Sequence, residues 1–254
     1  MNDQDIKFKD RFKVVITVGD ESGIGPEIIL KALCSTEIPK NVDILLVGSK
    51  INLENTYKTL KSLGTTNIAD PINYKIQDIQ IPFEMGQQKK SHGNASFLYL
   101  KKAIEIVQQY PNSALVTGPI CKKSWAIAGH YYSGQTELLA ESCKAKNVGM
   151  LFTAKSPFTG WRFNTLLATT HIPLCEVPKQ LNTQLINSKL DLLSEFCSNY
   201  IKNPVFKVAG LNPHAGEEGL LGSEEKDWIR NAVINWSKQN KGVEVSGPIS
   251  PDTC

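Results

Sequence analysis

Short runs of apolar residues alternate along the chain with stretches in which apolar residues recur at helical spacing. The apolar runs occupy residues 14–18, 43–47, 114–117, 165–169 and 206–209. Each run is brief and apolar on both faces, as is typical of strands in a sheet that is covered on two sides. Helical spacing occupies residues 26–33, 95–109, 136–145, 183–200 and 224–238. The alternation predicts an α/β fold with a mainly parallel or mixed sheet. Residues 65–80 are polar and irregular, and we expect a surface excursion there.

Composition and charge limit the kinds of molecule that the protein is expected to bind. The chain has 254 residues, of which 41% are hydrophobic, enough for a real core in one large or two modest domains. Its net charge of +3 is too small to indicate nucleic-acid binding. The apolar run 14–18 is too short for a signal peptide or a membrane span, and six cysteines without a close pair predict reduced thiols in the cytoplasm. We therefore look for small-molecule partners.

Two histidines follow predicted strands, where open α/β sheets bind their ligands. His171 lies in the segment 169–174 after the fourth strand, and His214 lies in the segment 210–219 after the fifth. A lone histidine in such a place is more often a hydrogen-bonded structural residue than a metal ligand. Two histidines in matching places make a metal or substrate site an equal alternative.

The glycine-rich loop 19–25 after the first strand is weak evidence for a dinucleotide site. Ile28 stands where the third glycine of that fingerprint should be, and Asp43 opens the next strand instead of closing it. A tight strand-to-helix turn is the favoured interpretation. Thr136 lies near the predicted start of a helix, where position alone favours capping over the binding of an anion.

Several segments together resemble one family. They are 16–27 (ITVGDESGIGPE), 117–122 (TGPICK), 134–137 (GQTE), 169–174 (TTHIPL), 210–217 (GLNPHAGE) and 247–253 (GPISPDT). These look like the ordered signature blocks of 4-hydroxythreonine-4-phosphate dehydrogenases. The blocks around His171 and His214 are the specific ones.

The resemblance implies an isocitrate-dehydrogenase-like fold, with two α/β/α lobes around a cleft and a mixed, mostly parallel sheet. On this basis residues 1–118 form the first lobe, which would be completed by a C-terminal continuation. Residues 119–254 form the second lobe, which carries the metal and substrate residues. A homodimer with active sites at its interface is also implied.

The resemblance further implies a reaction. NAD would accept a hydride from the hydroxyl-bearing carbon of 4-phosphooxy-L-threonine, and the resulting β-keto acid would lose carbon dioxide on the way to pyridoxal 5'-phosphate. His171 and His214 match metal ligands, for zinc, magnesium or cobalt. Gln135 and Thr136 match substrate contacts, and Asp252 matches an acidic catalytic residue.

The chain departs from the family pattern at three places. Gln135 stands where histidine is usual, and Cys121 stands where asparagine is usual. A third histidine ligand and most NAD contacts are expected beyond Cys254, which suggests a shortened chain. Two alternatives stay open: a dehydrogenase for a related threonate or erythronate 4-phosphate, and a non-catalytic remnant that binds ligands. A phosphate acyltransferase fits less well, since it would not call for two strand-end histidines.

Overall fold

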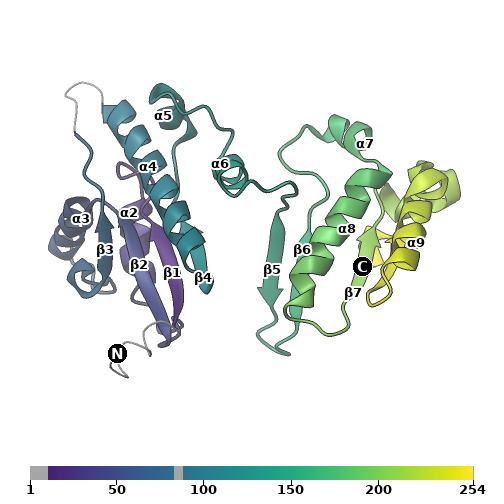
Figure 1. The fold of residues 1–254 in the computed structure, drawn as a ribbon, viewed down its shortest axis with the longest axis horizontal. Helices are drawn as coiled ribbons and strands as arrows, with labels where there is room; N and C mark the ends of the chain where they lie inside the picture. The colour runs from purple at the N-terminus through teal and green to yellow at the C-terminus, as the bar shows by residue number, and fades with distance from the viewer. Residues whose placement is uncertain (1–10, 83–87, 254) are drawn as a thin grey trace. The chain divides into compact units, whose positions relative to one another are not determined.

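The computed structural model describes residues 11–82 and 88–253 and divides into two compact units, residues 1–144 and 145–254 (Figure 1). The polar amino terminus and Cys254 lie outside the described residues. The units are defined by packing alone, and the lobe division at 118/119 that the sequence suggests stays a prediction.

The first unit contains a four-stranded, fully parallel sheet in the order β3-β2-β1-β4. Val15 in the inner strand β1 is in register with Leu45 of β2 and Leu115 of β4. The carboxyl ends of all four strands therefore lie at one edge of the sheet. The strands are β1 (Phe12–Thr17), β2 (Val42–Gly48), β3 (Lys75–Asp78) and β4 (Ser113–Thr117).

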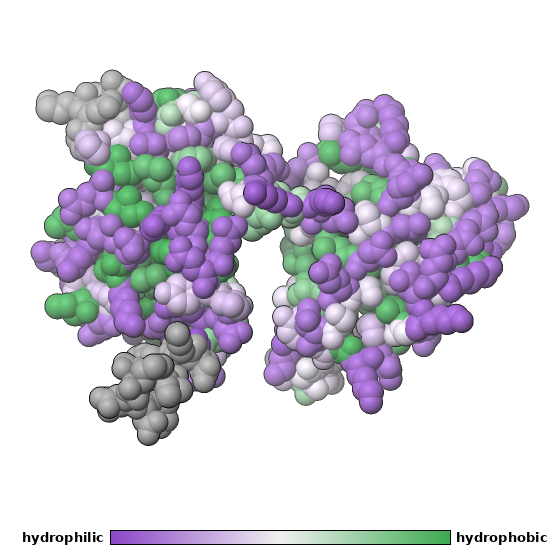
Figure 2. All heavy atoms as spheres, in the orientation of Figure 1, coloured by the Kyte–Doolittle hydropathy of each residue, from purple (hydrophilic) through white to green (hydrophobic). Residues whose placement is uncertain are grey.

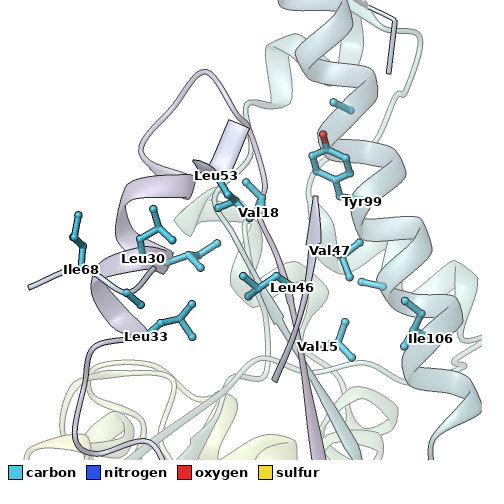
Figure 3. Close-up of a cluster of buried hydrophobic side chains, with 14 of the residues drawn as sticks. Val15, Val18, Leu30, Leu33, Leu46, Val47, Leu53, Ile68, Tyr99 and Ile106 are labelled. Atoms are coloured by element: carbon cyan, nitrogen blue, oxygen red, sulfur yellow. The ribbon is translucent and has the colours of Figure 1, made fainter. Parts of the chain in front are cut away.

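Helices cover both faces of this sheet. Figure 3 shows Leu30 of α2 and Leu33, which directly follows this helix, on one side of the strands, and Tyr99 and Ile106 of α4 on the other. Inner-strand residues such as Val15 are fully buried between these layers. This is the arrangement that strands apolar on both faces require. The helices that pack on this sheet are α2 (Gly25–Ala32), α3 (Lys50–Ser62) and α4 (Gln88–Gln109).

Two short helices, α5 (Lys122–Ile127) and α6 (Gln135–Ser142), complete the first unit. Trp125 of α5 is fully buried in a cluster with residues of α4 and α6, and its indole nitrogen donates to Ser96 Oγ at 2.8 Å. Gly93 permits the close approach of α4 and α5, because a Cβ there would lie 2.0 Å from the Ser124 carbonyl oxygen.

The second unit contains an antiparallel hairpin and a separate parallel pair of strands. Its core is built around Trp236, Phe206 and Ile229, with the Trp236 indole donating to Asp191 at 2.7 Å. The hairpin strands are β5 (Leu151–Lys155) and β6 (Arg162–Leu166), the parallel strands are β7 (Val205–Ala209) and β8 (Glu244–Ile249), and the helices are α7 (Val177–Gln180), α8 (Thr183–Ser198) and α9 (Arg230–Gln239).

The structure confirms the α/β class with mostly parallel sheets and corrects two local expectations. The strand expected at 165–169 instead spans Arg162–Leu166, because it pairs with β5 through a turn closed by a 2.8 Å bond from Ser156 N to the Trp161 carbonyl. The polar region 65–80 contains the strand β3, whose polar residues are tolerated because it lies at the edge of the sheet.

Polar residues are spread over the visible face of each unit (Figure 2). Among the described helices, none combines the length and the apolar character that crossing a membrane requires.

Candidate functional site

In the first unit, the loops that leave β1 and β4 lie against each other. Asp20 N donates to the Pro119 carbonyl at 2.8 Å, and Gly118 N donates to the Thr17 carbonyl at 3.0 Å. Gly19 has a φ of +76°, and a Cβ there would lie 2.3 Å from the Pro119 carbonyl oxygen. Only glycine fits such a place, which is the strand-to-helix turn expected from the sequence.

Gln135 joins the same edge of the sheet. It is the first residue of α6, and its Nε2 donates to the Gly118 carbonyl at 3.2 Å. Its Oε1 is buried and has no hydrogen-bond partner among the described residues. A buried acceptor without a partner is costly, so this oxygen is suited to accept a hydrogen bond from a ligand.

Thr136 lies next to Gln135 at the start of α6, and Lys122, the first residue of α5, approaches the same helix start. Thr136 is the exposed second residue of the helix, near the start that the sequence predicts. The N-cap is Gly134 and no side chain caps it, so the favoured capping interpretation of Thr136 is wrong. The Lys122 ammonium lies 3.7 Å from the position that a Cβ on Gly134 would take. Sequence reasoning gave Lys122 no role; the signal that could have found it is its place at the end of the loop that follows β4, where α5 begins. A lysine beside a helix start favours an anionic group.

Glu21 was also missed by sequence reasoning. Burial and, to a smaller extent, the neighbouring Asp20 carboxylate raise its pKa from 4.5 to about 7. The Tyr99 hydroxyl, almost fully buried, donates to Glu21 Oε1. Asp20 itself accepts bonds from Ser22 N at 2.9 Å and from Ser22 Oγ at 2.7 Å. No feature of the local sequence marks this pair, because 78 positions separate Glu21 and Tyr99.

In the second unit, His214 and Asp252 meet. They follow the parallel strands β7 and β8, which are joined beyond their paired residues by a 2.8 Å bond from Gly210 N to the Ile249 carbonyl. His214 Nδ1 lies 2.8 Å from Asp252 Oδ2, and both side chains are exposed. In this contact Nδ1 carries a proton and donates it to Asp252, so the other ring nitrogen, Nε2, is not used by the pair.

The backbone around His214 is unusual. His214, Ala215, Glu217 and Glu218 all have positive φ, between 44° and 57°, and Gly216 between them has a φ of 77°. Left-handed backbone costs a residue with a side chain about 1–2 kcal/mol, so the surrounding structure must hold this turn in place. Such strain in a segment that presents a histidine indicates a functional constraint.

Glu225 lies under this turn and is 1% exposed. Burial raises the pKa of its carboxyl, but hydrogen bonds from Asn212 N and from the Asn212 side chain outweigh burial, and the net pKa lies below the usual value. The carboxylate is therefore held in its charged form.

His171 lies apart from a strand end. It follows β6 by five positions, is exposed, and has a φ of 55°. Within residues 11–82 and 88–253, no group of three or more His, Cys, Asp or Glu side chains is placed to hold a metal ion. The convergence of His171 and His214 on one ion stays a prediction.

Comparison with known proteins gives the family. The model of the family described as "Pyridoxal phosphate biosynthetic protein PdxA" matches residues 40–254. A 4-hydroxythreonine-4-phosphate dehydrogenase from Synechococcus sp. (strain RCC307) is 43% identical over 244 residues, which cover 95% of this chain and 74% of the relative.

Two further comparisons extend this result. The crystal structure of a 4-hydroxythreonine-4-phosphate dehydrogenase from Klebsiella pneumoniae has a TM-score of 0.75 and 28% identity, over 96% of this chain and 75% of that one. A relative from Oceanobacillus iheyensis, provisionally named as a D-threonate 4-phosphate dehydrogenase, is 33% identical over 94% of this chain and 74% of its own length. The isocitrate-dehydrogenase-like fold expected from the sequence is thereby confirmed. With a family model over residues 40–254 and a relative of 43% identity along nearly the whole chain, the protein belongs to the PdxA family of dehydrogenases.

Proposed function

We propose that the chain is a 4-hydroxythreonine-4-phosphate dehydrogenase of pyridoxal phosphate biosynthesis, which uses NAD and a divalent metal ion. The relative with 43% identity carries this name, and the match extends over 95% of the chain. That match is the observation on which the proposal rests. The described contacts of His214 and Gln135 are consistent with it.

His214 fits the role of a metal ligand. With Nδ1 bonded to Asp252 at 2.8 Å, Nε2 is free to bind a cation, and the carboxylate fixes the orientation of the ring. His171 is the proposed second ligand. A divalent zinc, magnesium or cobalt ion would lower the pKa of the substrate hydroxyl and polarise the ketone formed from it. NAD would accept the hydride, and we assign it no residue among those described.

Gln135 and Thr136 fit the role of substrate contacts. The unpartnered Oε1 of Gln135 can accept a hydrogen bond from an ammonium or hydroxyl group. Thr136 lies at the start of α6 and the Lys122 ammonium of α5 lies close to this helix start, where the helix dipole and a lysine favour a phosphate. Asp252 is proposed to orient His214 and to act as the acidic residue of the site.

A homodimer belongs to the same proposal. The β5–β6 hairpin carries large exposed side chains, with Phe152 57%, Phe158 95% and Trp161 64% exposed. Exposed aromatic residues on one hairpin are suited to an interface with a second copy. Five cysteines of the described chain are free thiols, in keeping with a reducing, cytoplasmic compartment: Cys34, Cys121, Cys143, Cys175 and Cys197.

A dehydrogenase for D-threonate 4-phosphate or the related erythronate compound is the second candidate. The provisional name of the Oceanobacillus relative favours it. The acceptor on Gln135 would bind the hydroxyl that replaces the amine in these acids as readily as the amine itself.

NADH formation tests both candidates. The purified chain is mixed with NAD and with zinc or magnesium. The 4-phosphates of 4-hydroxythreonine, threonate and erythronate are then added in separate reactions. Faster turnover of 4-hydroxythreonine 4-phosphate supports the first candidate, and faster turnover of threonate 4-phosphate supports the second. Absence of NADH with all three compounds and both metals would overturn both candidates.

A further inference from the structure

The turn formed by residues 213–219 cannot hold its shape through its own sequence. Four of its residues with side chains have positive φ. The backbone bonds at its ends run from Ala215 N to the Asn212 carbonyl at 3.1 Å, from Leu220 N to the Glu217 carbonyl at 3.2 Å and from Leu221 N to the Gly216 carbonyl at 3.1 Å. Left-handed backbone of this length is unfavourable for L-residues, so contacts from outside the turn must stabilise it.

The Glu225 carboxylate supplies such contacts. Its Oε1 accepts from Asn212 N at 2.6 Å, and its Oε2 accepts from Asn212 Nδ2 at 2.9 Å. The Asn212 amide also donates to Glu224 Oε2 at 2.7 Å. Bonds to a carboxylate are roughly twice as strong as neutral ones, and Glu225 is 1% exposed, so water competes little for them.

Two glycines allow the backbone of the turn to approach the Glu225 carboxylate closely. A Cβ on Gly210 would lie 3.2 Å from Glu225 Oε1, and a Cβ on Gly216 would lie 2.8 Å from Glu225 Oε2. Gly210 precedes His214 and Gly216 follows it. Glu225 therefore lies against the chain on both sides of the histidine.

We propose that Glu225 is a positioning residue, which holds the turn 213–219 so that His214 presents its Nε2 to a divalent metal ion. The inference rests on the proposed metal-binding role of His214. Glu225 acts through Asn212 and the backbone of the turn. It opens the helical turn Glu225–Ile229, which continues directly into α9. Ile229 of this turn and Val233 and Trp236 of α9 are buried in the core of the second unit, so the turn 213–219 is anchored to a rigid element.

The test compares zinc binding to the whole chain and three variants, by calorimetric titration with zinc alone. Glu225→Gln keeps the size of the side chain but places an amide where Asn212 N or Nδ2 needs an acceptor. We expect it to weaken zinc binding about tenfold or more. Glu244→Gln is the matched control, since Glu244 is exposed at the opposite end of β8, and it should bind zinc as the unmodified chain does. His214→Gln should abolish binding at this position.

A second readout reports on the turn itself. A glutamate-specific protease should cleave after the exposed Glu217 and Glu218 faster in Glu225→Gln than in Glu244→Gln, as located by mass spectrometry. Near-ultraviolet circular dichroism checks that each variant is folded. If Glu225→Gln fails to fold, Asn212→Ala removes the side-chain donors while keeping the bond from its backbone N–H, and should weaken zinc binding about threefold.

The outcomes separate the two proposals. Loss of zinc binding in His214→Gln together with unchanged binding in Glu225→Gln, or in Asn212→Ala where the former is unfolded, would overturn the positioning role alone. Unchanged binding in His214→Gln would overturn the metal role of this histidine, and the positioning role with it. Weaker binding and faster cleavage in Glu225→Gln, against an unaffected control, support the inference.

Discussion

The loop after β1 and the turn after β7 both leave the carboxyl end of a parallel strand, but different forces hold them. In the first, positive φ falls on Gly19, and backbone groups of the β4 exit loop supply the contacts. In the second, positive φ falls on four residues with side chains, and the Glu225 carboxylate supplies the contacts. Backbone freedom shapes one loop, and a buried charge shapes the other.

The glutamates beside these loops show the same contrast. Burial and the Asp20 charge raise the pKa of Glu21 to about 7. Burial acts in the same direction on Glu225, but the donors on Asn212 overcome it and leave its pKa below the usual value. Glu225 is nevertheless the more buried of the two. Nearby hydrogen-bond donors, more than depth, decide which form of a carboxyl the fold stabilises.

The largest expected effect is at Gly19. Gly19→Ala would combine a φ of +76° with a Cβ 2.3 Å from the Pro119 carbonyl oxygen, and we expect it to lower the free energy of unfolding of the first unit by about 3–5 kcal/mol. Gly64→Ala is the matched control, since Gly64 has a φ of +81° with nothing within 4 Å, and should cost about 1 kcal/mol. Urea denaturation measures both. Equal losses would show that the close approach of the two loops contributes nothing.

Glu225→Ala should have the next largest effect, in the second unit. It removes the buried carboxylate that Asn212 N and Nδ2, both part-buried, need as acceptor, and we expect a loss of about 2–4 kcal/mol. Glu21→Ala should change the free energy of unfolding of the first unit by about 1 kcal/mol or less at neutral pH, because it removes the bonds to the Tyr99 hydroxyl and the Ser49 backbone but also relieves the repulsion from Asp20. Hydrogen exchange measured on individual peptides shows which of the two units each substitution destabilises. A larger loss for Glu21→Ala would contradict the contrast between the two loops.

Glu21 and Glu225 should change the free energy of unfolding in opposite directions as the pH rises, because their pKa values are shifted in opposite directions. A carboxyl whose pKa is raised from 4.5 to about 7 stabilises the fold below the lower value, and this contribution is lost as pH rises through about 7. Glu21→Gln should therefore match the unmodified chain near pH 4.5 and be more stable by about 1–2 kcal/mol near pH 8, a range reduced for solvent screening because Glu21 is only half-buried.

Glu27→Gln is the control for this measurement, since the Glu27 side chain is 40% exposed and pairs with Lys31 at 2.5 Å in the same unit. It is measured at the same two pH values, and the effect of Glu21→Gln is read relative to it. The opposite sign is expected for Glu225, whose lowered pKa makes its contribution present at neutral pH and lost on acidification. A Glu21→Gln variant that is less stable than the unmodified chain near pH 8 would refute the assignment.

The smallest effect is expected at the surface of the turn. Arg230 lies 3.7 Å from Glu218, and the two side chains are 51% and 79% exposed. Arg230→Gln should change the free energy of unfolding by less than about 0.5 kcal/mol, because exposed ion pairs are weak. Thermal unfolding of the two chains side by side measures it. A loss as large as that of Glu225→Ala would show that the exposed ion pair stabilises the turn as much as the buried carboxylate does.

The sequence by itself determined the α/β class, the strands β1, β2, β4 and β7, the strand-end segments that carry Gly19 and His214, and the helix start next to Gln135. These features depend on local pattern: apolar runs, helical spacing, and glycine where a turn needs it. The same signature segments indicated the family that the comparisons establish.

Tertiary structure decided the rest. The strand at the edge of the first sheet, the register of β6 against β5, and the Tyr99–Glu21 contact depend on partners distant in the chain. The left-handed turn around His214 depends on Glu225, a charge that the local sequence does not distinguish from the neighbouring Glu224. A backbone conformation that its own residues disfavour can be stable only when contacts from elsewhere outweigh the local cost, and those contacts exist only once the chain has folded.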